Sequence, residues 1–258
     1  MVQELQIGGT SEDAVLGGRL RLRQPLSGHR VGHDAILLAA ATGGRSGEHA
    51  ADLGAGVGAA GLALAKRVDG LRVTLVEIDV ALCALAAENA LLNGLDDRVA
   101  VHAADVEDAL TLGAAGFKPG AFDRVLMNPP FHDTTRQNLS PDPRRRLAHA
   151  AAPGLLSRWI ASAAWLLKRH GMLTLIWRAD ELAAVEAALA ADFGAVAVLP
   201  VLPRPDASAI RVLVRAVRAG VGASVTYPGL VLTDAQGKPS AAAEAVLRGG
   251  DALMPAKS

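Results

Sequence analysis

Cysteine is almost absent from this sequence of 258 residues, which contains only Cys83. A single cysteine cannot form a disulfide within the chain and cannot build a zinc site by itself. Cys83 lies in an apolar run at residues 81–85, where a buried structural thiol is expected rather than a nucleophile. The sequence therefore implies no disulfide and no metal.

Long hydrophobic runs are absent too. No uncharged apolar stretch of about 18 or more residues occurs, and the first residues, Met1-Val2-Gln3-Glu4, lack the basic and then apolar profile of a signal peptide. The hydrophobic content is nevertheless 51%, which suffices for a sizeable core. We expect a soluble globular protein without a membrane partner, with the cytoplasm as its compartment.

Charge of one sign is not in excess either. The 26 basic residues balance the 26 acidic ones, which excludes the overall positive field of a histone-like nucleic-acid binder. Contact with nucleic acid would have to come from local patches, and for each patch a solvated surface is the alternative to phosphate binding. One patch contains Arg19, Arg21, Arg23, His29 and Arg30. A second contains Arg136, Arg144, Arg145 and Arg146.

From Asp34 onward, apolar helical segments and apolar strand-like segments follow one another. The expected strands cover residues 50–53, 72–78, 98–103, 122–127 and 172–177, and the expected helices cover residues 34–41, 59–66, 80–93, 155–168 and 180–191. Nearly continuous apolar strands separated by helices predict a parallel sheet that is covered on both faces. Trp159, Trp165 and Trp177 are expected to serve in packing.

The carboxyl-terminal part changes character. Two apolar segments at residues 195–202 and 209–216 are joined by a loop of Pro, Asp and Ser, with no helix between them. Strands connected in this way are expected to pair antiparallel. Residues 220–258 are expected to form a short extra strand and then to fray.

A glycine-rich turn follows the first strand of the predicted sheet. Its sequence is Asp52-Leu53-Gly54-Ala55-Gly56-Val57-Gly58. Glycines permit a tight backbone and close approach to a ligand, and the helix that follows offers free backbone amides. The same spacing also occurs in nicotinamide enzymes and in plain turns. Asp52 favours S-adenosylmethionine, because a carboxylate attracts the cationic amino-acid end of that cofactor and would repel a pyrophosphate.

Acidic residues follow the next two strands. Glu77 is placed to accept hydrogen bonds from two ribose hydroxyls, a role that Asp79 could share although capping the next helix suits it better. Asp105 can accept a hydrogen bond from the amine of an adenine, and the Val106 amide can donate to a ring nitrogen. A cap or turn role is the alternative for each acid alone, but their succession at strand ends favours a cofactor site.

The most informative motif is Asn128-Pro129-Pro130-Phe131, at the end of the predicted strand 122–127. Taken alone, it could be ordinary loop chemistry, since proline fixes φ and keeps the preceding residue out of a helix. Its position at the carboxyl end of a strand is, however, where open α/β sheets bind ligands. The motif therefore marks a candidate substrate site.

Together these motifs resemble the amino-methyltransferase branch of class I S-adenosylmethionine-dependent methyltransferases, whose hallmark is Asn-Pro-Pro followed by Phe or Tyr. The resemblance covers roughly residues 50–216. The stretches at 16–25 and 29–39 are similar to the leading segment of bacterial tRNA adenine-N6-methyltransferases, which act next to the anticodon of a valine tRNA. The resemblance implies a Rossmann-like α/β fold with a mostly parallel seven-stranded sheet, helices on both faces and a carboxyl-terminal antiparallel hairpin.

The resemblance also implies how the chain is divided and what it binds. Residues 1–45 would form an N-terminal segment that packs on the cofactor side, residues 46–220 the catalytic domain, and residues 221–258 a partly flexible C-terminal extension. S-adenosylmethionine would be the cofactor and tRNA the partner, and a monomer is assumed. Arg30 and Asp34 would fold over the cofactor, although ion-pair or capping roles suit them equally well.

The expected chemistry centres on Asn128. An exocyclic amine is a poor nucleophile, because its lone pair is delocalised into the ring. The Asn128 side-chain oxygen and the Pro129 carbonyl can accept its two N–H bonds and aim the lone pair at the methyl group. Pro130 helps to hold that carbonyl rigid, and Phe131 offers a ring for stacking, worth roughly 1–3 kcal/mol per base. No general base is required, because the amine becomes acidic only after attack.

Three other functions stay open on the sequence. Enzymes with a similar motif methylate the amine of rRNA guanine or a glutamine amide of release factors. The residues before Ala50 are too few for the helical substrate domain of the release-factor enzymes, and the duplicated domain of many guanine enzymes is absent from the sequence. A non-catalytic module that binds the cofactor or RNA is the third alternative, against which the intact Asn128 and the three acids argue.

Overall fold

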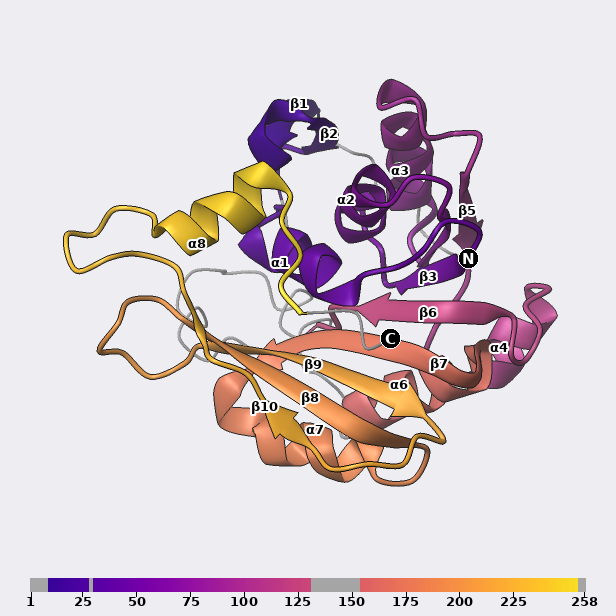
Figure 1. The fold of residues 1–258 in the computed structure, drawn as a ribbon. Coiled ribbons are helices and arrows are strands. Elements are labelled where there is room, and N and C mark those ends of the chain that lie inside the picture. Colours follow the sequence, from indigo (N-terminus) through magenta and orange to yellow (C-terminus); the bar gives the residue numbers. More distant parts are fainter. Residues whose placement is uncertain (1–8, 28–29, 131–153, 255–258) are drawn as a thin grey trace, which may run out of the picture.

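The computed structural model describes residues 9–27, 30–130 and 154–254. Its main sheet has the strand order β10-β8-β9-β7-β6-β3-β4-β5, and β11 also pairs with β8 (Figure 1). The long strands are β3 (His49–Leu53), β4 (Arg72–Glu77), β5 (Val99–Ala103), β6 (Phe122–Met127), β7 (Leu167–Arg178), β8 (Phe193–Leu202) and β9 (Arg211–Arg218). The pairs among β3 to β7 are parallel, whereas β9 pairs antiparallel with both β7 and β8. The predicted mostly parallel sheet with an antiparallel hairpin at its end is confirmed.

Helices cover both faces of this sheet, as predicted (Figure 1). One face carries α1 (His33–Thr42), α2 (Ala59–Arg67) and α3 (Val80–Leu92), and the other carries α4 (Ala109–Ala114), α6 (Leu155–Leu166), the short turn η3 (Ala179–Glu181) and α7 (Leu182–Leu189). The buried side chains form two clusters, one on each face, and Trp159 and Trp177 lie in the second. Within the described ranges, no helix is long and apolar enough to cross a membrane.

The prediction of seven strands is wrong, because the sheet has nine strands among the described residues. The additional strands are β10 (Val225–Thr226) and β11 (Leu230–Val231), which both pair parallel with β8 on the side away from β9. An edge strand presents unpaired N–H and C=O groups, and the returning chain satisfies some of them. One short extra strand was expected in residues 220–258, and the structure has two. Two residues are too few to show a strand period, so the sequence does not indicate where in this part the strands form.

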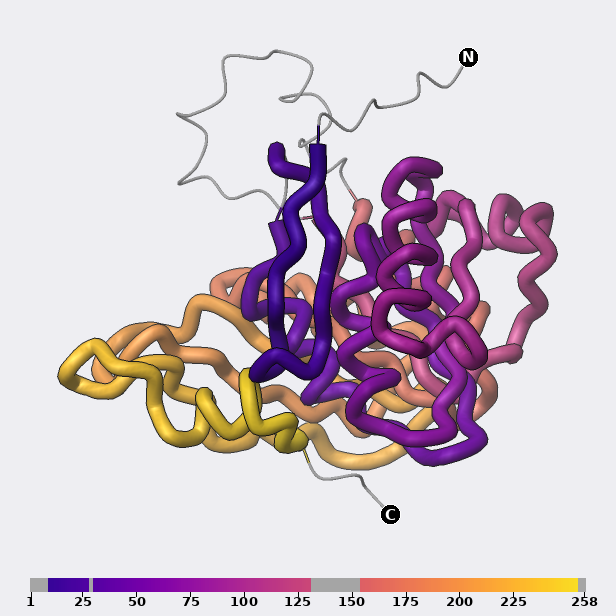
Figure 2. Tube along the Cα trace, turned by 90° about the horizontal axis from the view of Figure 1, so that it is seen from above, coloured from indigo at the N-terminus to yellow at the C-terminus, as the bar shows by residue number. Residues whose placement is uncertain are grey.

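A second, two-stranded sheet precedes α1 in a region for which no strand was predicted. β1 (Thr10–Val15) and β2 (Leu20–Pro25) pair antiparallel around the 3-10 turn η1 (Leu16–Gly18). β2 alternates buried leucines with exposed arginines, so that Leu20 and Leu22 enter the core. β2 contacts α3, and η1 contacts the turn η4 (Ala245–Gly249), so the hairpin lies between α3 and η4 (Figure 2).

Two arginines fasten the carboxyl-terminal elements to the main sheet and its helices. These elements are α8 (Ala241–Glu244) and the π-helical turn η4 (Ala245–Gly249). Arg67 donates to the carbonyls of Val246 at 2.7 Å and Asp251 at 2.9 Å. Arg215, which is only 5% exposed, donates to the carbonyl of Met254 at 3.1 Å. Burial lowers the pKa of both guanidinium groups to about 10, so both are charged at neutral pH.

Replacing Arg67 by Met should therefore lower the free energy of unfolding by about 2 kcal/mol, because two carbonyls lose a charged donor. The matched control is Arg248→Met in the same segment, since Arg248 is exposed and its ion pair with Glu244 is 3.5 Å long. That control should change stability by less than about 0.5 kcal/mol. Urea unfolding of the two variants measures the difference, and equal losses would contradict the anchoring role of Arg67.

Candidate functional site

The carboxyl ends of four parallel strands bring the candidate residues to one edge of the sheet. In the register of β3 with its neighbours, Leu53 lies opposite Val76 of β4 and Met127 of β6. Gly54, Glu77 and Asn128, which come next in the chain, therefore begin side by side at this edge. This arrangement is where open α/β sheets hold their ligands.

The glycine turn between β3 and α2 has the backbone geometry that only glycine adopts without strain. Gly54, Gly56 and Gly58 have φ values of +67°, +57° and +88°. The turn is held against β4, because the amides of Gly54 and Ala55 both donate to the Val76 carbonyl, at 2.8 and 3.0 Å. A Cβ atom on Gly54 would lie 2.4 Å from the ring of Trp159, whereas one on Gly56 would meet nothing within 4 Å.

Glu77 binds the same turn from the end of β4. Its carboxylate is 8% exposed and accepts hydrogen bonds from the Gly56 amide at 2.8 Å and the Asp79 amide at 3.0 Å. Each carboxylate oxygen has a further lone pair, so both oxygens can accept another hydrogen bond. Asp79 caps α3 by accepting from the amides of its first turn, which confirms the capping role favoured for it.

Asp52 is buried beneath the glycine turn. Its side chain is 3% exposed and accepts a hydrogen bond from the Gly61 amide at 2.7 Å, which ties the end of β3 to α2. Burial raises the pKa of this carboxyl to about 7, against the Gly61 hydrogen bond and with help from the negative charge of Glu77. A contact between Asp52 and a cofactor stays a prediction.

The turn after β5 has the geometry expected of an aspartate turn. Asp105 accepts a hydrogen bond from the Glu107 amide at 2.9 Å, and Val106 is 5% exposed. Glu107 also accepts two hydrogen bonds from Arg158 of α6, at 2.7 and 3.0 Å. The turn is thereby fixed to the helix whose Trp159 ring covers Gly54.

Asn128 follows β6 directly, and Oδ1 of its side chain is buried without a hydrogen-bond partner in the described part of the chain. A buried acceptor without a partner is costly, so such atoms commonly mark a place for a ligand or an ordered water. Pro129 is buried and Pro130 is exposed. Phe131, together with Arg136, Arg144, Arg145 and Arg146, lies outside the described residues.

Arg30 and Asp34 are both held in ion pairs. Arg30 lies 2.6 Å from Asp13 of β1, and Asp34 lies 3.0 Å from Arg211 of β9. These contacts are the ion-pair roles that the sequence left open for them. A contact of either residue with a cofactor stays a prediction.

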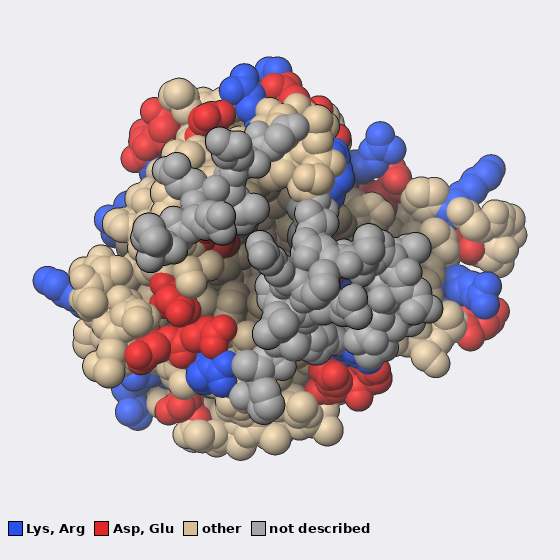
Figure 3. Space-filling view, turned by 180° about the vertical axis from the view of Figure 1, so that it is seen from behind, with Lys and Arg blue, Asp and Glu red and all other residues tan. Residues whose placement is uncertain are grey.

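On the face shown in Figure 3, described residues of both charge signs lie around a hollow, and among these residues neither sign forms a continuous patch. The arginines of the amino-terminal patch that lie in the described ranges bind groups of the protein itself. Arg21 pairs with Glu12, Arg23 with Glu88, Arg30 with Asp13, and Arg19 with the Arg248 carbonyl. Most of this patch is thus neutralised within the fold. The residues that the structure describes contain no group of three side chains suited to hold a metal.

Two residues of this site were not found from the sequence. Trp159 was expected only to pack in the core, yet its ring also sets the space above Gly54. Asn89 of α3 donates a hydrogen bond to the Val57 carbonyl inside the glycine turn, at 3.0 Å. No signal in the sequence indicates either contact, because both join elements that are distant along the chain.

Comparison with known proteins relates this chain to methyltransferases. A family model described as Methyltransferase small domain matches residues 27–201. The tRNA1(Val) (adenine(37)-N6)-methyltransferase of Dyadobacter fermentans is 27% identical over 218 residues, which cover 84% of this chain and 87% of that protein.

Solved structures show the same Rossmann-like fold. The crystal structure of a predicted O-methyltransferase from Agrobacterium tumefaciens has a TM-score of 0.73 and 28% identity, covering 87% of this chain and all of that one. The Thermus thermophilus 16S rRNA N2 G1207 methyltransferase, solved with AdoMet and guanosine, has a TM-score of 0.56 and 23% identity. That match covers 81% of this chain and 50% of the other. The predicted Rossmann-like methyltransferase fold is confirmed.

The glycines of the turn should differ in their tolerance of a side chain. Gly56→Ala should cost about 1–2 kcal/mol of unfolding free energy, from its positive φ alone. Gly54→Ala should cost a further 1–3 kcal/mol or so, because its Cβ would collide with Trp159. Trp159→Leu should relieve part of that further cost in the Gly54→Ala background. Denaturant unfolding measures all three, and equal costs at the two glycines would refute the close approach of Trp159.

Stability should depend on pH through Asp52. The pKa of Asp52 rises from 3.8 to about 7 on folding. Between these two pH values, the folded protein keeps a proton that the unfolded chain has lost. The free energy of unfolding therefore falls as the pH rises from about 4 to about 7, by a few kcal/mol. Asp52→Asn keeps the oxygen that accepts from Gly61 and removes this titration. Its advantage in melting temperature over the wild type should grow across that pH range, whereas parallel curves would rule out the raised pKa.

Proposed function

The chain belongs to the methyltransferase small domain family, and we propose that it methylates the exocyclic N6 amine of an adenine in tRNA, near the anticodon. The protein is a methyltransferase that uses S-adenosylmethionine to modify nucleic acid or protein. The finer specificity for tRNA adenine is supported by the Dyadobacter relative, whose name states that reaction.

The residues at the sheet edge fit S-adenosylmethionine. That cofactor supplies an electrophilic methyl group on a sulfonium centre. Glu77 has lone pairs left for two ribose hydroxyls, and the glycine turn leaves room for a ligand to approach Gly56. We assign cofactor binding to Asp52, Gly54, Gly56, Gly58, Glu77, Asp105, Val106 and Asn128, with Arg30 and Asp34 at its border.

The single observation that carries the proposal is that the buried Oδ1 of Asn128 has no hydrogen-bond partner in the described part of the chain. An amide oxygen is a strong acceptor, and this one is buried although Asn128 as a whole is only half-buried. It lies at the end of β6 beside the glycine turn of β3. An amine that donates one N–H bond to this oxygen, and the other to the Pro129 carbonyl, has its lone pair directed out of the base plane. Asn128 therefore orients the nucleophile and stabilises the charge that grows on nitrogen.

The remaining assignments concern the RNA. We propose that Phe131 stacks on the target base, with Pro130 holding the preceding carbonyl in place, and that Arg136, Arg144, Arg145 and Arg146 bind phosphates of the tRNA. The neutralised amino-terminal arginines support this choice, because they leave little free charge on the hairpin. Residues 46–220 would be the catalytic unit, acting on tRNA in the cytoplasm.

A guanine amine in rRNA is the second candidate acceptor. The structural likeness to the Thermus thermophilus enzyme extends over 81% of this chain, and a guanine N2 amine presents the same two N–H bonds to Asn128. A glutamine amide of a release factor has the same planar nitrogen. These acceptors differ in what surrounds the nitrogen, so the proposal is tested by offering all three.

The test is transfer of labelled methyl from S-adenosylmethionine to total tRNA, to rRNA and to a release factor, followed by analysis of the modified nucleoside. We expect N6-methyladenosine in tRNA. Asn128→Ala should reduce the rate at saturating cofactor about 100-fold or more, a loss far larger than any loss of cofactor affinity. The matched variant Glu77→Gln should instead weaken cofactor binding about tenfold or more.

Label in rRNA or in the release factor, but not in tRNA, would keep the role of Asn128 and contradict the proposed substrate. Binding of S-adenosylmethionine without transfer to any acceptor would contradict catalysis itself and favour a non-catalytic binding module.

A further inference from the structure

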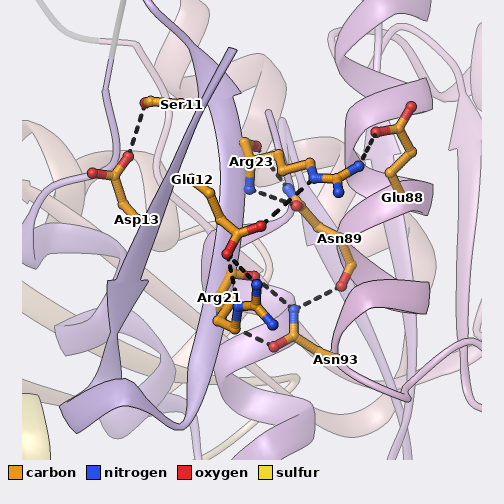
Figure 4. A network of polar contacts seen from close by, with 8 residues as sticks. All are labelled: Ser11, Glu12, Asp13, Arg21, Arg23, Glu88, Asn89 and Asn93. Atoms are coloured by element: carbon orange, nitrogen blue, oxygen red, sulfur yellow. Dashed lines mark hydrogen bonds and ion pairs between the residues drawn. The ribbon is translucent and has the colours of Figure 1, made fainter.

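Two asparagine side chains of α3 bind the backbone of β2 along the edge that does not pair with β1 (Figure 4). Oδ1 of Asn89 accepts from the Arg23 amide at 2.7 Å, and its Nδ2 donates to the Arg23 carbonyl at 2.9 Å. Oδ1 of Asn93 accepts from the Arg21 amide at 2.9 Å, and its Nδ2 donates to the Arg21 carbonyl at 2.7 Å. Each amide thus replaces one residue of a neighbouring strand.

The spacing of a helix explains why two asparagines can do this. Four residues of a helix advance by about 6 Å, and two residues of a strand advance by nearly the same distance, about 6.7 Å. Asn89 therefore lies opposite Arg23, and Asn93 lies opposite Arg21. The N–H and C=O groups of both arginines point to the same side of β2. The hairpin is bound to α3 through its backbone, so its position does not depend on the exposed arginine side chains.

The two asparagines differ in their third hydrogen bond. Nδ2 of Asn93 also donates to the Asn89 carbonyl, within α3 itself, at 2.7 Å. Nδ2 of Asn89 instead donates to the Val57 carbonyl at 3.0 Å. Val57 follows Gly56, whose amide is bound by the Glu77 carboxylate at 2.8 Å. The glycine turn is therefore held at two consecutive residues, by Glu77 through an amide and by Asn89 through a carbonyl.

Asn89 is fully buried, with 0% of its surface exposed, and it makes all three of these side-chain hydrogen bonds inside the protein. A buried carbonyl that loses its donor pays a desolvation penalty, so the turn would shift to recover a partner. Such a shift would leave only a fraction of the molecules with the turn ready for its ligand. The apparent association constant would then be the intrinsic one multiplied by that fraction.

We propose that Asn89 is a positioning residue for S-adenosylmethionine, which sets the glycine turn through the Val57 carbonyl and couples it to the hairpin through Arg23. This inference rests on the proposed function, because it assigns the turn to that cofactor. Asn93 fastens the same hairpin from the same face of α3 and has no hydrogen bond to the turn. It is therefore a matched control for Asn89.

The test compares Asn89→Ala, Asn93→Ala and the wild type as full chains, by calorimetric titration with S-adenosylmethionine. Asn89→Ala should raise the dissociation constant about tenfold, and Asn93→Ala should change it by less than about twofold. Amide hydrogen exchange at Arg21 and Arg23 should speed up in both variants, because both loosen the hairpin. In methyl transfer, Asn89→Ala should raise the KM for the cofactor and leave kcat near the wild-type value at saturation.

If Asn89→Ala does not fold, Asn89→Asp replaces it, since it keeps the shape and the acceptor for Arg23 but has no N–H for the Val57 carbonyl. Wild-type affinity in a folded Asn89 variant would overturn the inference. Equal losses of affinity in the Asn89 and Asn93 variants would also overturn it, because the hairpin rather than the turn would then control binding. Failure of the wild type to bind S-adenosylmethionine would overturn the proposed function and this inference together.

Discussion

The hydrogen bond from the Gly56 amide to the Glu77 carboxylate is the interaction on which the rest of the site depends. It joins the turn after β3 to the end of β4, and it is possible only because parallel pairing brings the ends of these strands to one edge. Positive φ values at Gly54, Gly56 and Gly58 allow the chain to curl toward that carboxylate. A carboxylate that already holds the turn at one lone pair is oriented to receive ligand hydroxyls with the others.

Buried polar groups, rather than additional apolar area, fix the parts that surround this turn. Asp52 ties β3 to α2 through the Gly61 amide, and Asn89 ties α3 to both the turn and the hairpin. Arg67 ties α2 to the carboxyl-terminal elements in the same manner, through backbone carbonyls. Each of these groups is costly to bury unless its partners are in place, so each contact fixes how two elements sit against each other. Hydrophobic packing alone would let these elements slide past each other. Oδ1 of Asn128 stands apart from them, because it is buried and has no hydrogen-bond partner among the described residues.

Much of the fold could be predicted from the sequence, because β3, β4, β5 and β6 are short, mostly apolar segments with glycine, an acidic residue or Asn-Pro-Pro at their carboxyl ends. The hairpin of β1 and β2 was missed because only β2 alternates apolar and charged residues, over the four residues Leu20 to Arg23, and β1 does not. A short strand was expected between residues 220 and 258, but two residues carry no period, so the positions of β10 and β11 could not be predicted. At the site, Glu77 and Asn128 could be placed at a strand end from their positions in the chain. The ion pairs of Arg30 and Asp34 could not, because their partners, Asp13 and Arg211, come from other elements whose packing no local pattern encodes.

A crystal structure of the protein with S-adenosylhomocysteine would show whether the glycine turn, Glu77 and Asn128 form one site. We predict that the ribose hydroxyls bind the Glu77 carboxylate, that the amide of Gly56 keeps its bond to the same group, and that Oδ1 of Asn128 faces the sulfur with room for an amine between them. A ligand bound away from the glycine turn, or an Asn128 side chain directed away from the sulfur, would contradict it.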